Sequence, residues 1–314
     1  MELIQVDKVE ILIVIDNYAD SMLEPAPGVK RREIANEGFL PTDTVLAEHG
    51  VCMLITAWKD DKKVGVIFDA GFSPVAAPRN IEFLGESLEH VQALAISHAH
   101  EDHIGATSQI LQMAGNPPLH VHPICFHHPR YWRNDNGTML QYPDMLNKEK
   151  LLGEGATIVE KTGPSVIGGG LLLLTGQIPR HTDFEHALPG SVMEVDGEIV
   201  EDVVLDDQAV VLDVAGHGLV VLSGCGHAGI VNTINYAREL TAGRPLYVVM
   251  GGFHLPGSQF KYAVRPTIEA IKAENPAMVV PMHCTGTEAK AHFRFEFGSV
   301  FVDSAVGTRI QLPF

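Results

Sequence analysis

Short apolar runs, each closed by Gly, Asp or Asn, recur through the first hundred residues of the chain. Runs of this length that are rich in Val, Ile and Leu are typical of buried strands. The predicted strands are Val9–Ile15, Val51–Trp58, Val64–Asp69 and Val91–Ser97. After His103 the apolar spacing becomes that of a helix, whose buried face would carry Ile104, Ile110 and Leu111.

Strand and helix patterns alternate again in the last hundred residues. The predicted strands are Ala209–Val214, Gly218–Leu222, Leu246–Met250 and Met278–Pro281, with further strands near Phe301 and Ile310. The predicted helices are Gly229–Thr241, Val264–Glu274 and Glu288–Phe297. Alternation in both halves predicts an α/β fold in which two sheets lie between layers of helices.

The segment from His127 to about Leu205 has a different pattern, with Pro, Gly and Asn clusters and few long periodic runs. We therefore expect a single domain over residues 1–314, with 127–205 as a cap segment inserted within it. Aromatic and basic residues in this segment suit stacking on a flat ring and holding an anion, although they could equally pack a small core of its own. They are Tyr131, Trp132, Arg133, Tyr142, Arg180, His181 and Phe184.

Composition and charge restrict the class of partner. Apolar residues make up 46% of the chain and charged residues 19%, which is ordinary for a globular protein. The 22 basic and 39 acidic residues give a net charge of −17, which opposes binding to nucleic acids and anionic membranes. A small anionic substrate remains compatible, because a bound metal ion can reverse the local field. Oligomerisation stays open.

The location suggested by the sequence is the cytoplasm. The first apolar run, Val9–Ile15, is shorter than a secretory signal core and follows mixed charges. No run reaches the roughly 18 apolar residues of a membrane span. Four cysteines without a framework spacing, Cys52, Cys125, Cys225 and Cys284, suggest free thiols in a reducing compartment.

Four metal-ligating side chains stand within six residues where the strand ending at Ser97 runs into a helix. They are His98, His100, Asp102 and His103. Side chains two apart in an extended segment share a face, so His98 and His100 can converge on one ion. Once the chain turns into a helix, Asp102 and His103 can point toward a second ion. Imidazole and carboxylate are ligands that zinc and similar divalent metals accept.

A polar turn with solvated histidines is the plain alternative to this interpretation. The chain has 16 histidines, so chance doublets such as His127–His128 are expected. An H-x-H-x-D-H set between an apolar strand and a helix is much harder to obtain by chance, which favours a metal site.

Further ligands must come from later in the chain, because one segment cannot complete two coordination spheres. Two strand ends with this layout carry them: Cys225 and His227 follow one strand, and His283 follows another. Cys225 and His227 compete for the same role, and neutral imidazole favours His227. Cys284 is expected to be a packing residue.

A series of motifs along nearly the whole chain resembles the metallo-β-lactamase superfamily. The matching stretches are His98 to Gly105, Val14 to Asn17, Ile67 to Gly71, Ile178 to Glu185, Asp206 to Ala209, Ser223 to Gly229, Gly251 to Leu255 and Pro281 to Gly286. They are most similar to the branch known as dihydropterin-6-ylmethyl-ribofuranosylaminobenzene-phosphate synthase, or as metal-dependent hydrolase of β-lactamase superfamily type II.

This resemblance implies a four-layer αββα sandwich and an enzyme with one or two metal ions, zinc first, with manganese or iron as alternatives. His100 stands where di-iron flavoproteins of the superfamily place Glu, which favours zinc. The implied reaction joins a pterin-methyl diphosphate to an aminobenzene ribofuranosyl phosphate. The alternatives are a broad metallo-hydrolase acting on phosphodiesters, lactones or thioesters, and a non-catalytic ligand sensor, against which the intact ligand set argues.

Roles for individual residues complete the expectation. The metal ligands are His98, His100, Asp102, His103, His227, His283 and Cys225. Asp102 and His254 are the predicted catalytic residues, and Arg180, His254 and Trp132 the predicted substrate contacts; His254 and Arg180 could instead be ordinary loop residues. Asp69 is expected to orient a ligand from behind. Ala99, Glu101, Gly226 and His181 depart from the branch pattern, and Glu101 would alter the wall beside the ions.

Overall fold

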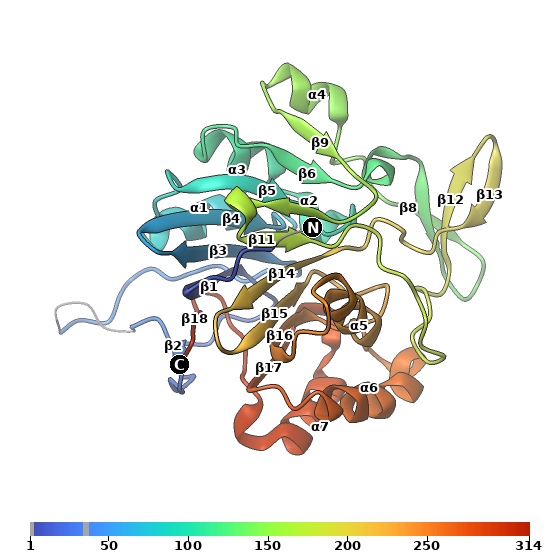
Figure 1. Ribbon diagram of the computed structural model, residues 1–314. Coiled ribbons are helices and arrows are strands. Elements are labelled where there is room, and N and C mark those ends of the chain that lie inside the picture. The colour runs from blue at the N-terminus through green and yellow to red at the C-terminus, as the bar shows by residue number, and fades with distance from the viewer. Residues whose placement is uncertain (1–2, 34–37) are drawn as a thin grey trace.

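The apolar runs of the N-terminal half form the first of two large sheets in a computed structural model that describes residues 3–33 and 38–314 (Figure 1). This sheet has eight strands in the order β2-β18-β1-β3-β4-β5-β6-β9. Their bounds are β1 Lys8–Ile15, β2 Val29–Lys30, β3 Cys52–Lys59, β4 Lys62–Phe68, β5 Val91–Ala95, β6 Leu119–Val121, β9 Ile158–Glu160 and β18 Arg309–Leu312.

The second sheet has six strands in the order β10-β11-β14-β15-β16-β17. Their bounds are β10 Ser165–Ile167, β11 Leu172–Leu174, β14 Ala209–Val214, β15 Gly218–Ser223, β16 Leu246–Gly252 and β17 Met278–Met282. Every residue of β14 to β17 is buried, which is why these strands read as continuous apolar runs rather than alternating ones.

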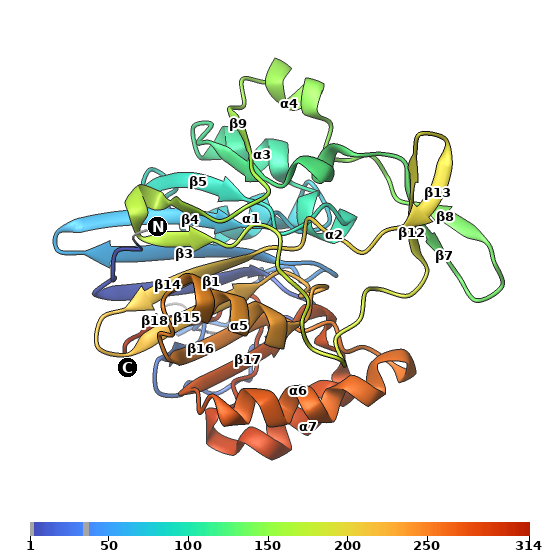
Figure 2. The same cartoon turned by 45° about the vertical axis from the view of Figure 1, so that its right-hand side comes forward.

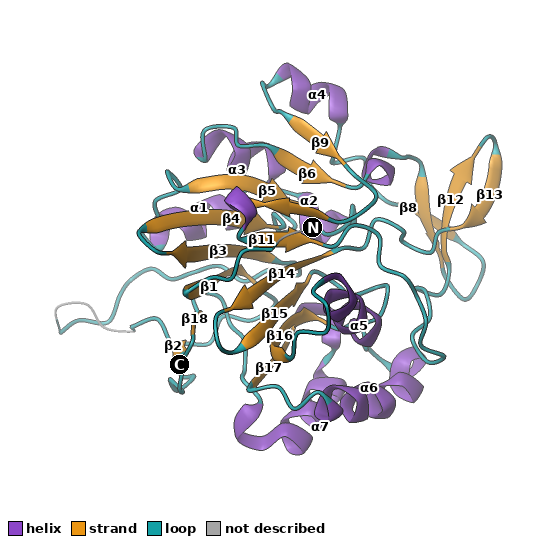
Figure 3. Ribbon diagram, viewed as in Figure 1, coloured by secondary structure: helices purple, strands orange, loops and turns teal. Residues whose placement is uncertain are grey.

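Helices cover the outer face of each sheet (Figures 2 and 3). The α-helices are α1 Ala76–Phe83, α2 Glu101–Ile104, α3 Thr107–Met113, α4 Lys148–Gly153, α5 Ile230–Leu240, α6 Lys261–Ala273 and α7 Thr287–Phe297. Short 3₁₀ helices are η1 Pro123–Phe126, η2 Gly168–Gly170, η3 Ser258–Phe260, η4 His283–Thr285 and η5 Gly298–Val300. Helices α1 to α4 lie on the side of the first sheet, and α5 to α7 on the side of the second.

Three apolar clusters lie between the four layers of the fold and join them. The central cluster joins the facing sides of the two sheets, with residues such as Ile55 and Val220. A second cluster joins the first sheet to its helices, for example through Leu94 and Ile110. A third joins the second sheet to its helices, for example through Val249. The predicted αββα sandwich is therefore confirmed.

The segment 127–205 is divided among three sheets. Its strands β9, β10 and β11 extend the two large sheets, while four others form a small separate sheet in the order β13-β12-β7-β8. These are β7 Arg130–Arg133, β8 Met139–Gln141, β12 Ser191–Val195 and β13 Glu198–Glu201. The small sheet stands at one edge of the sandwich, on the side where α2 lies (Figures 1 and 2).

Two predicted elements differ from the structure. The region near Phe301 is not a strand, since Phe301 makes only an isolated bridge with Val279. The helix predicted after His103 is split into α2 and α3, because the amide of Gly105 donates to the carbonyl of Gly71 (2.7 Å) rather than continuing the helix.

The parallel strands bring chemistry-bearing residues to one edge. Strands β4, β5 and β6 are parallel to one another, and so are β15, β16 and β17. Ligands commonly bind beyond the carboxyl ends of such strands, and the predicted metal ligands and His254 follow β5, β15, β16 and β17. Among the described residues, no helix is both long and apolar enough to cross a bilayer.

We predict that Gly105→Ala destabilises the protein by about 1–3 kcal/mol or more, since overpacking of this kind forces backbone shifts. A Cβ at this position would lie 1.8 Å from the carbonyl oxygen of Phe72. Denaturant unfolding measures the loss. Gly153→Ala is the matched control, because nothing lies within 4 Å of the added carbon there. Equal stability of the two variants would contradict the prediction.

Candidate metal centre

The segment after β5 sets the first group of ligands. The chain remains extended through His100, whose φ and ψ are −73° and 150°, and α2 begins at the next residue. His98 and His100 therefore lie side by side, with His98 Nε2 at 3.0 Å from His100 Nδ1. Asp102 and His103 occupy the first turn of α2, and both are buried.

Residues from the second sheet complete the cluster. Cys225 and His227 follow β15, and His283 begins η4 after β17. His227 Nε2 lies 3.1 Å from His100 Nδ1. Cys225 Sγ lies 3.2 Å from His103 Nε2 and 3.3 Å from His283 Nε2.

Two overlapping groups emerge, in each of which the ligand atoms lie within 4.8 Å of one another. One contains Asp102, His103, Cys225 and His283; the other contains His98, Cys225 and His227, with His100 adjoining it. The expected competition between Cys225 and His227 is absent from this geometry, since the structure brings both into the cluster.

The donor set fits a transition metal. Imidazole nitrogens point at one another across 3.0–3.1 Å around His100. Two more buried ring nitrogens, His100 Nε2 and His227 Nδ1, have no hydrogen-bond partner. These two atoms lie on the far edges of their rings, so the fit rests on the converging nitrogens: neutral imidazoles cannot all donate to one another, and an ion placed among them would accept a lone pair from each. Zinc accepts all three ligand types.

Burial keeps the imidazoles on one side of the cluster neutral. It lowers the pKa of His98 and His227 well below the usual value for histidine, and the neighbouring imidazoles add to the effect. It also lowers the pKa of His100 to about 4. These three side chains are therefore in the neutral, metal-binding form at pH 7.

On the other side of the cluster, the pKa values of His103 and Asp102 favour the charged forms of both side chains. Burial alone would lower the pKa of His103, but the carboxylates of Asp102 and Asp69 outweigh burial and raise it to about 9. Burial would likewise raise the pKa of Asp102, but His103 and His283 outweigh it and lower that pKa. Positive and negative groups thus hold each other charged in this half.

Residues behind the cluster fix the ligands. Asp69, fully buried, accepts hydrogen bonds from the amide and hydroxyl of Ser97 (2.7 and 2.8 Å) and contacts His103 Nδ1 at 2.7 Å. Asp16 accepts from the amide of His283 (3.0 Å), and Asn17 Oδ1 lies 3.0 Å from His283 Nδ1. The position of Asp69 agrees with its expected role behind His103.

Three residues in and around the cluster have left-handed backbone conformations. Asp69, His254 and His283 have φ values of 64°, 40° and 46°, a region that most L-residues rarely adopt and that Asp and His enter more often than others. Strained residues persist where the surrounding structure holds them, and they concentrate at functional sites.

His254 lies beside the cluster rather than in either of the two groups. Its ring is 4.2 Å from that of His227, and neither of its nitrogens has a partner. It forms a third group with Cys225 and Cys284. Cys284 was expected only to pack, and it does so tightly: a Cβ on Gly252 would lie 2.6 Å from its sulfur.

The predicted substrate contacts are placed unequally. Arg180 is next to the cluster, but its Nη2 donates to the backbone carbonyls of Val203 and of His227, the latter at 3.3 Å. Trp132 lies on β7 and is 38% exposed, with no ring contact to the ligands. Tyr142, from the same segment, stacks on His100 at 4.9 Å between ring centroids.

Sequence reasoning missed two residues at the centre. His49 Nε2 lies 3.3 Å from Asp102 Oδ2, and its ring is 4.8 Å from that of His283. Asn17 lies in one of the motifs shared with the superfamily, but nothing in the sequence indicates a role for it. His49 lies in an irregular stretch before β3, and no spacing in the sequence relates it to the H-x-H-x-D-H set.

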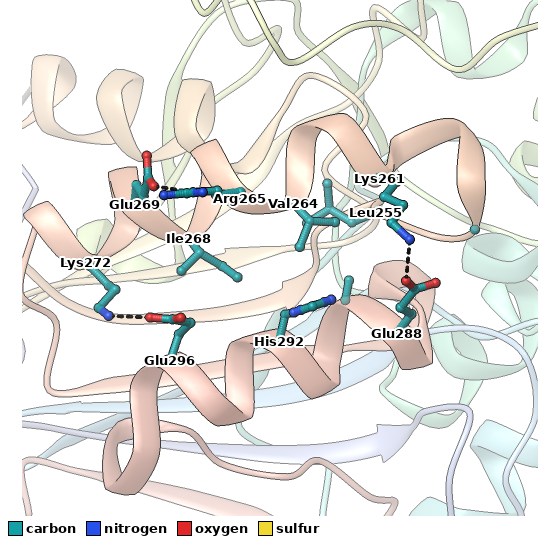
Figure 4. Close-up of a pocket in the computed structure, with 12 residues that line it drawn as sticks. Leu255, Lys261, Val264, Arg265, Ile268, Glu269, Lys272, Glu288, His292 and Glu296 are labelled. Atoms are coloured by element: carbon teal, nitrogen blue, oxygen red, sulfur yellow. Dashed lines mark hydrogen bonds and ion pairs between the residues drawn. The ribbon is translucent and has the colours of Figure 1, made fainter.

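A wider groove lies away from this centre, between α6 and α7 (Figure 4). Its volume is about 740 Å³, and its floor includes Val264 and Ile268. The ion pairs Lys261–Glu288 and Lys272–Glu296 cross it. None of the predicted site residues lines it.

We predict that binding of one of two ions is strongly pH-dependent. Ligands must be deprotonated, so an ion held by His103 must displace a proton at pH 7, because the pKa of His103 without metal is about 9. Its affinity should rise with pH up to about 9. The ion beside His100 should displace no proton from that imidazole, whose pKa is about 4. An ion that also binds Cys225 should displace its thiol proton, because burial raises the pKa of that thiol well above its usual value. Calorimetry in buffers of different ionisation enthalpy counts the protons; two pH-independent affinities between pH 7 and 9 would contradict this.

We also predict that Asp69→Asn weakens metal binding about 10–100-fold, the usual cost of losing a partner behind a ligand. Asparagine has only one acceptor oxygen, and its NH₂ group cannot accept a hydrogen bond, so Ser97 or His103 loses its acceptor and His103 loses its orientation. Chelator competition measures the affinity. Asp213→Asn, a buried aspartate that pairs with Arg244, is the control. Unchanged affinity in Asp69→Asn would show that this carboxylate does not position His103.

Comparison with known proteins agrees with the fold. The family model described as the metallo-beta-lactamase superfamily matches residues 46–283. A Methanocaldococcus jannaschii protein named 7,8-dihydropterin-6-methyl-4-(beta-D-ribofuranosyl)-aminobenzene-5'-phosphate synthase is 26% identical over 264 residues, which are 81% of this chain and 87% of that protein. An uncharacterized protein of the same organism is 28% identical over 77% of this chain and 86% of its own length.

One solved structure supports the same fold. The crystal structure of Tm1679, described as a metal-dependent hydrolase of the beta-lactamase superfamily, has a TM-score of 0.70 and 22% identity, covering 98% of this chain and 99% of that one. The resemblance inferred from the sequence motifs is therefore confirmed. Since the family model spans most of the chain, this protein belongs to the metallo-β-lactamase superfamily.

Proposed function

We propose that this chain is a metal-dependent enzyme with a two-ion centre, most simply zinc, that condenses a pterin-methyl diphosphate with an aminobenzene ribofuranosyl phosphate. The observation that carries the metal part is the convergence of buried ligand atoms from both sheets, shared through Cys225. The relative named as this synthase, aligned over 81% of the chain, supports the choice of substrates.

Each residue has a defined part in the proposed centre. Asp102, His103 and His283 hold one ion; His98, His100 and His227 hold the other; and Cys225 stands between them. Ions bound there would polarise substrate oxygens and neutralise a departing diphosphate. Asp102 contacts both His103 and His283, and we propose it as the catalytic carboxylate beside the first ion.

The condensation needs one bond to form and one to break. The amine nitrogen of the aminobenzene attacks the pterin methylene carbon, the carbon–oxygen bond to diphosphate breaks, and the amine releases one proton. His254, with two unpartnered ring nitrogens beside His227, is our proposed acceptor for that proton or contact for the leaving group. It borders a small cavity of about 20 Å³ with His227 and Phe260.

Substrate recognition would fall to the segment 127–205. Tyr142 lies against His100, which supports the proposal that part of this segment covers the centre. We propose Trp132 as a more distant contact for a flat ring. Arg180 donates through Nη2 to two backbone carbonyls, which indicates that it supports the loop carrying His227. Its Nε has no partner and is available to an anion.

A metallo-hydrolase is the second candidate. The observation that favours it is the ligand set itself, since a pair of ions that activates water needs no protein nucleophile. Phosphodiesters, lactones and thioesters are the substrates to compare. In the condensation the arylamine attacks the pterin methylene carbon, whereas a hydrolase would direct water to a carbon or phosphorus atom of its substrate.

The test begins with elemental analysis of purified protein, for which we predict about one to two equivalents of zinc, manganese or iron per chain. The loaded protein is then given both proposed substrates in ¹⁸O-labelled water, and products are separated by mass spectrometry. We expect the condensed product, diphosphate and little labelled pterin alcohol. His227→Ala should lower turnover more than about 100-fold, since losing a ligand costs more than losing its supporting partner.

His292→Ala, a histidine of the α6–α7 groove, is the control and should retain full turnover. Labelled alcohol as the main product, or fast turnover of a generic phosphodiester with no condensation, would replace the synthase with the hydrolase. Protein without metal after loading would contradict the metal centre altogether.

A further inference from the structure

Three consecutive residues that the proposed function does not use, Asp206, Asp207 and Gln208, form contacts with both ligand-bearing loops. They lie in the turn before β14, and all three are buried, at 0%, 2% and 1% exposure. Buried carboxylates carry a desolvation cost that hydrogen bonds and ion pairs offset. Their partners therefore indicate what they do.

We propose that Asp206, Asp207 and Gln208 are positioning residues that clamp His98, His100 and His227 into one metal site. This inference rests on the metal centre proposed above and adds to it the residues that determine the affinity of one ion and not of the other.

Asp206 holds the loop between the first two ligands. Its Oδ2 accepts a hydrogen bond from the amide of Ala99 (2.9 Å), the residue between His98 and His100. A bond to the backbone at this point restrains the separation of the two imidazoles, which depends on the extended conformation of the three residues.

Gln208 holds the chain just before the same ligands. Its side-chain Nε2 donates to the carbonyl of Ile96 (2.8 Å), and its amide donates to the carbonyl of Ser97 (3.1 Å). Together with Asp206 it places hydrogen bonds on both sides of His98.

Asp207 holds the other loop. Its Oδ2 accepts from the amide of Ala228 (2.6 Å), the residue after His227. Because Asp206 and Asp207 are adjacent, the loop after β5 and the loop after β15 are both fixed to one short segment. The distance between the His100 and His227 rings then follows from that segment.

Arg130 secures the clamp from the small sheet. Its guanidinium, 1% exposed, bridges Asp202 (2.7 and 3.2 Å) and Asp206 (2.8 and 3.0 Å). One cation shared by two carboxylates leaves Asp206 an acceptor with fixed orientation. Arg130 lies on β7, so the small sheet is tied to the ligand loop through this pair.

The hydrogen bonds of the clamp go to residues beside His98, His100 and His227, and none goes to His103 or His283. His103 and His283 are held instead by Asp69, Asp16 and Asn17. Loss of the clamp should therefore weaken one ion selectively, whereas a residue that served only folding would lower both affinities or neither.

The test uses Asp207→Ala and Gln208→Ala in the full-length protein, because removing Asp206 would leave Arg130 with a single partner and could prevent folding. Zn²⁺ affinities are measured by chelator competition, and the geometry of the site by the visible absorption of the Co²⁺ form. We expect one of two dissociation constants to rise about 10–100-fold, the other to stay within about threefold, and the Co²⁺ spectrum to change. The Zn²⁺ ion that binds more weakly in these variants should be the same ion that His227→Ala no longer binds.

Two further variants separate positioning from stability. Asp207→Asn keeps an acceptor oxygen for Ala228 and should restore near-normal affinity. Asp213→Ala removes a buried carboxylate at the other end of β14 and should leave both affinities unchanged. Unfolding of each metal-free variant is measured in parallel.

Unchanged affinities in both clamp variants, or equal weakening of both ions in proportion to lost stability, would overturn the proposal. A wild-type chain that binds no Zn²⁺ would instead contradict the metal centre itself, so the two failures are distinguishable.

Discussion

The centre depends on a close approach between the two sheets at Gly224. A Cβ at this position would lie 2.1 Å from Ser97 Oγ and 2.8 Å from Asp69 Oδ2. Any side chain would therefore force the end of β15 away from the end of β5. With glycine there, Cys225 reaches His103 and His283, and His227 reaches His100. The ligand set is a property of the contact between the sheets, not of either sheet alone.

This contact explains why so much strain and buried charge gather at one edge. The strands end together, and the turns that follow β4, β16 and β17 place Asp69, His254 and His283 at positive φ. The charged side chains are paired before any ion binds, as Asp102 is with His103 and His283. The scaffold therefore supplies a preorganised site, and its cost is met by the large apolar interior that surrounds it.

Most strands and helices and the first group of ligands could be predicted from the sequence, because hydrophobic periodicity and local spacing indicate them. Strand β14 matches its predicted range, and most other predicted elements differ by a few residues at their ends. The H-x-H-x-D-H set is local, so it is visible without a fold. The contributions of His49, Asn17 and the clamp are not local: each meets the ligands from a distant segment, and only the packing of the sheets brings them together.

The clamp also bears on how an acidic protein could accept an anionic substrate. Two arginines near the centre already have partners: Arg130 pairs with the carboxylates of Asp202 and Asp206, and Arg180 donates through Nη2 to two backbone carbonyls. Their charge is offset or directed into the scaffold, within a chain of net charge −17. In the proposed enzyme the attraction for phosphate would then come mainly from the bound ions, whose field acts locally in a buried site. Metal affinity and substrate affinity would thereby be coupled, because residues that position the ions would also determine how strongly the site holds an anion.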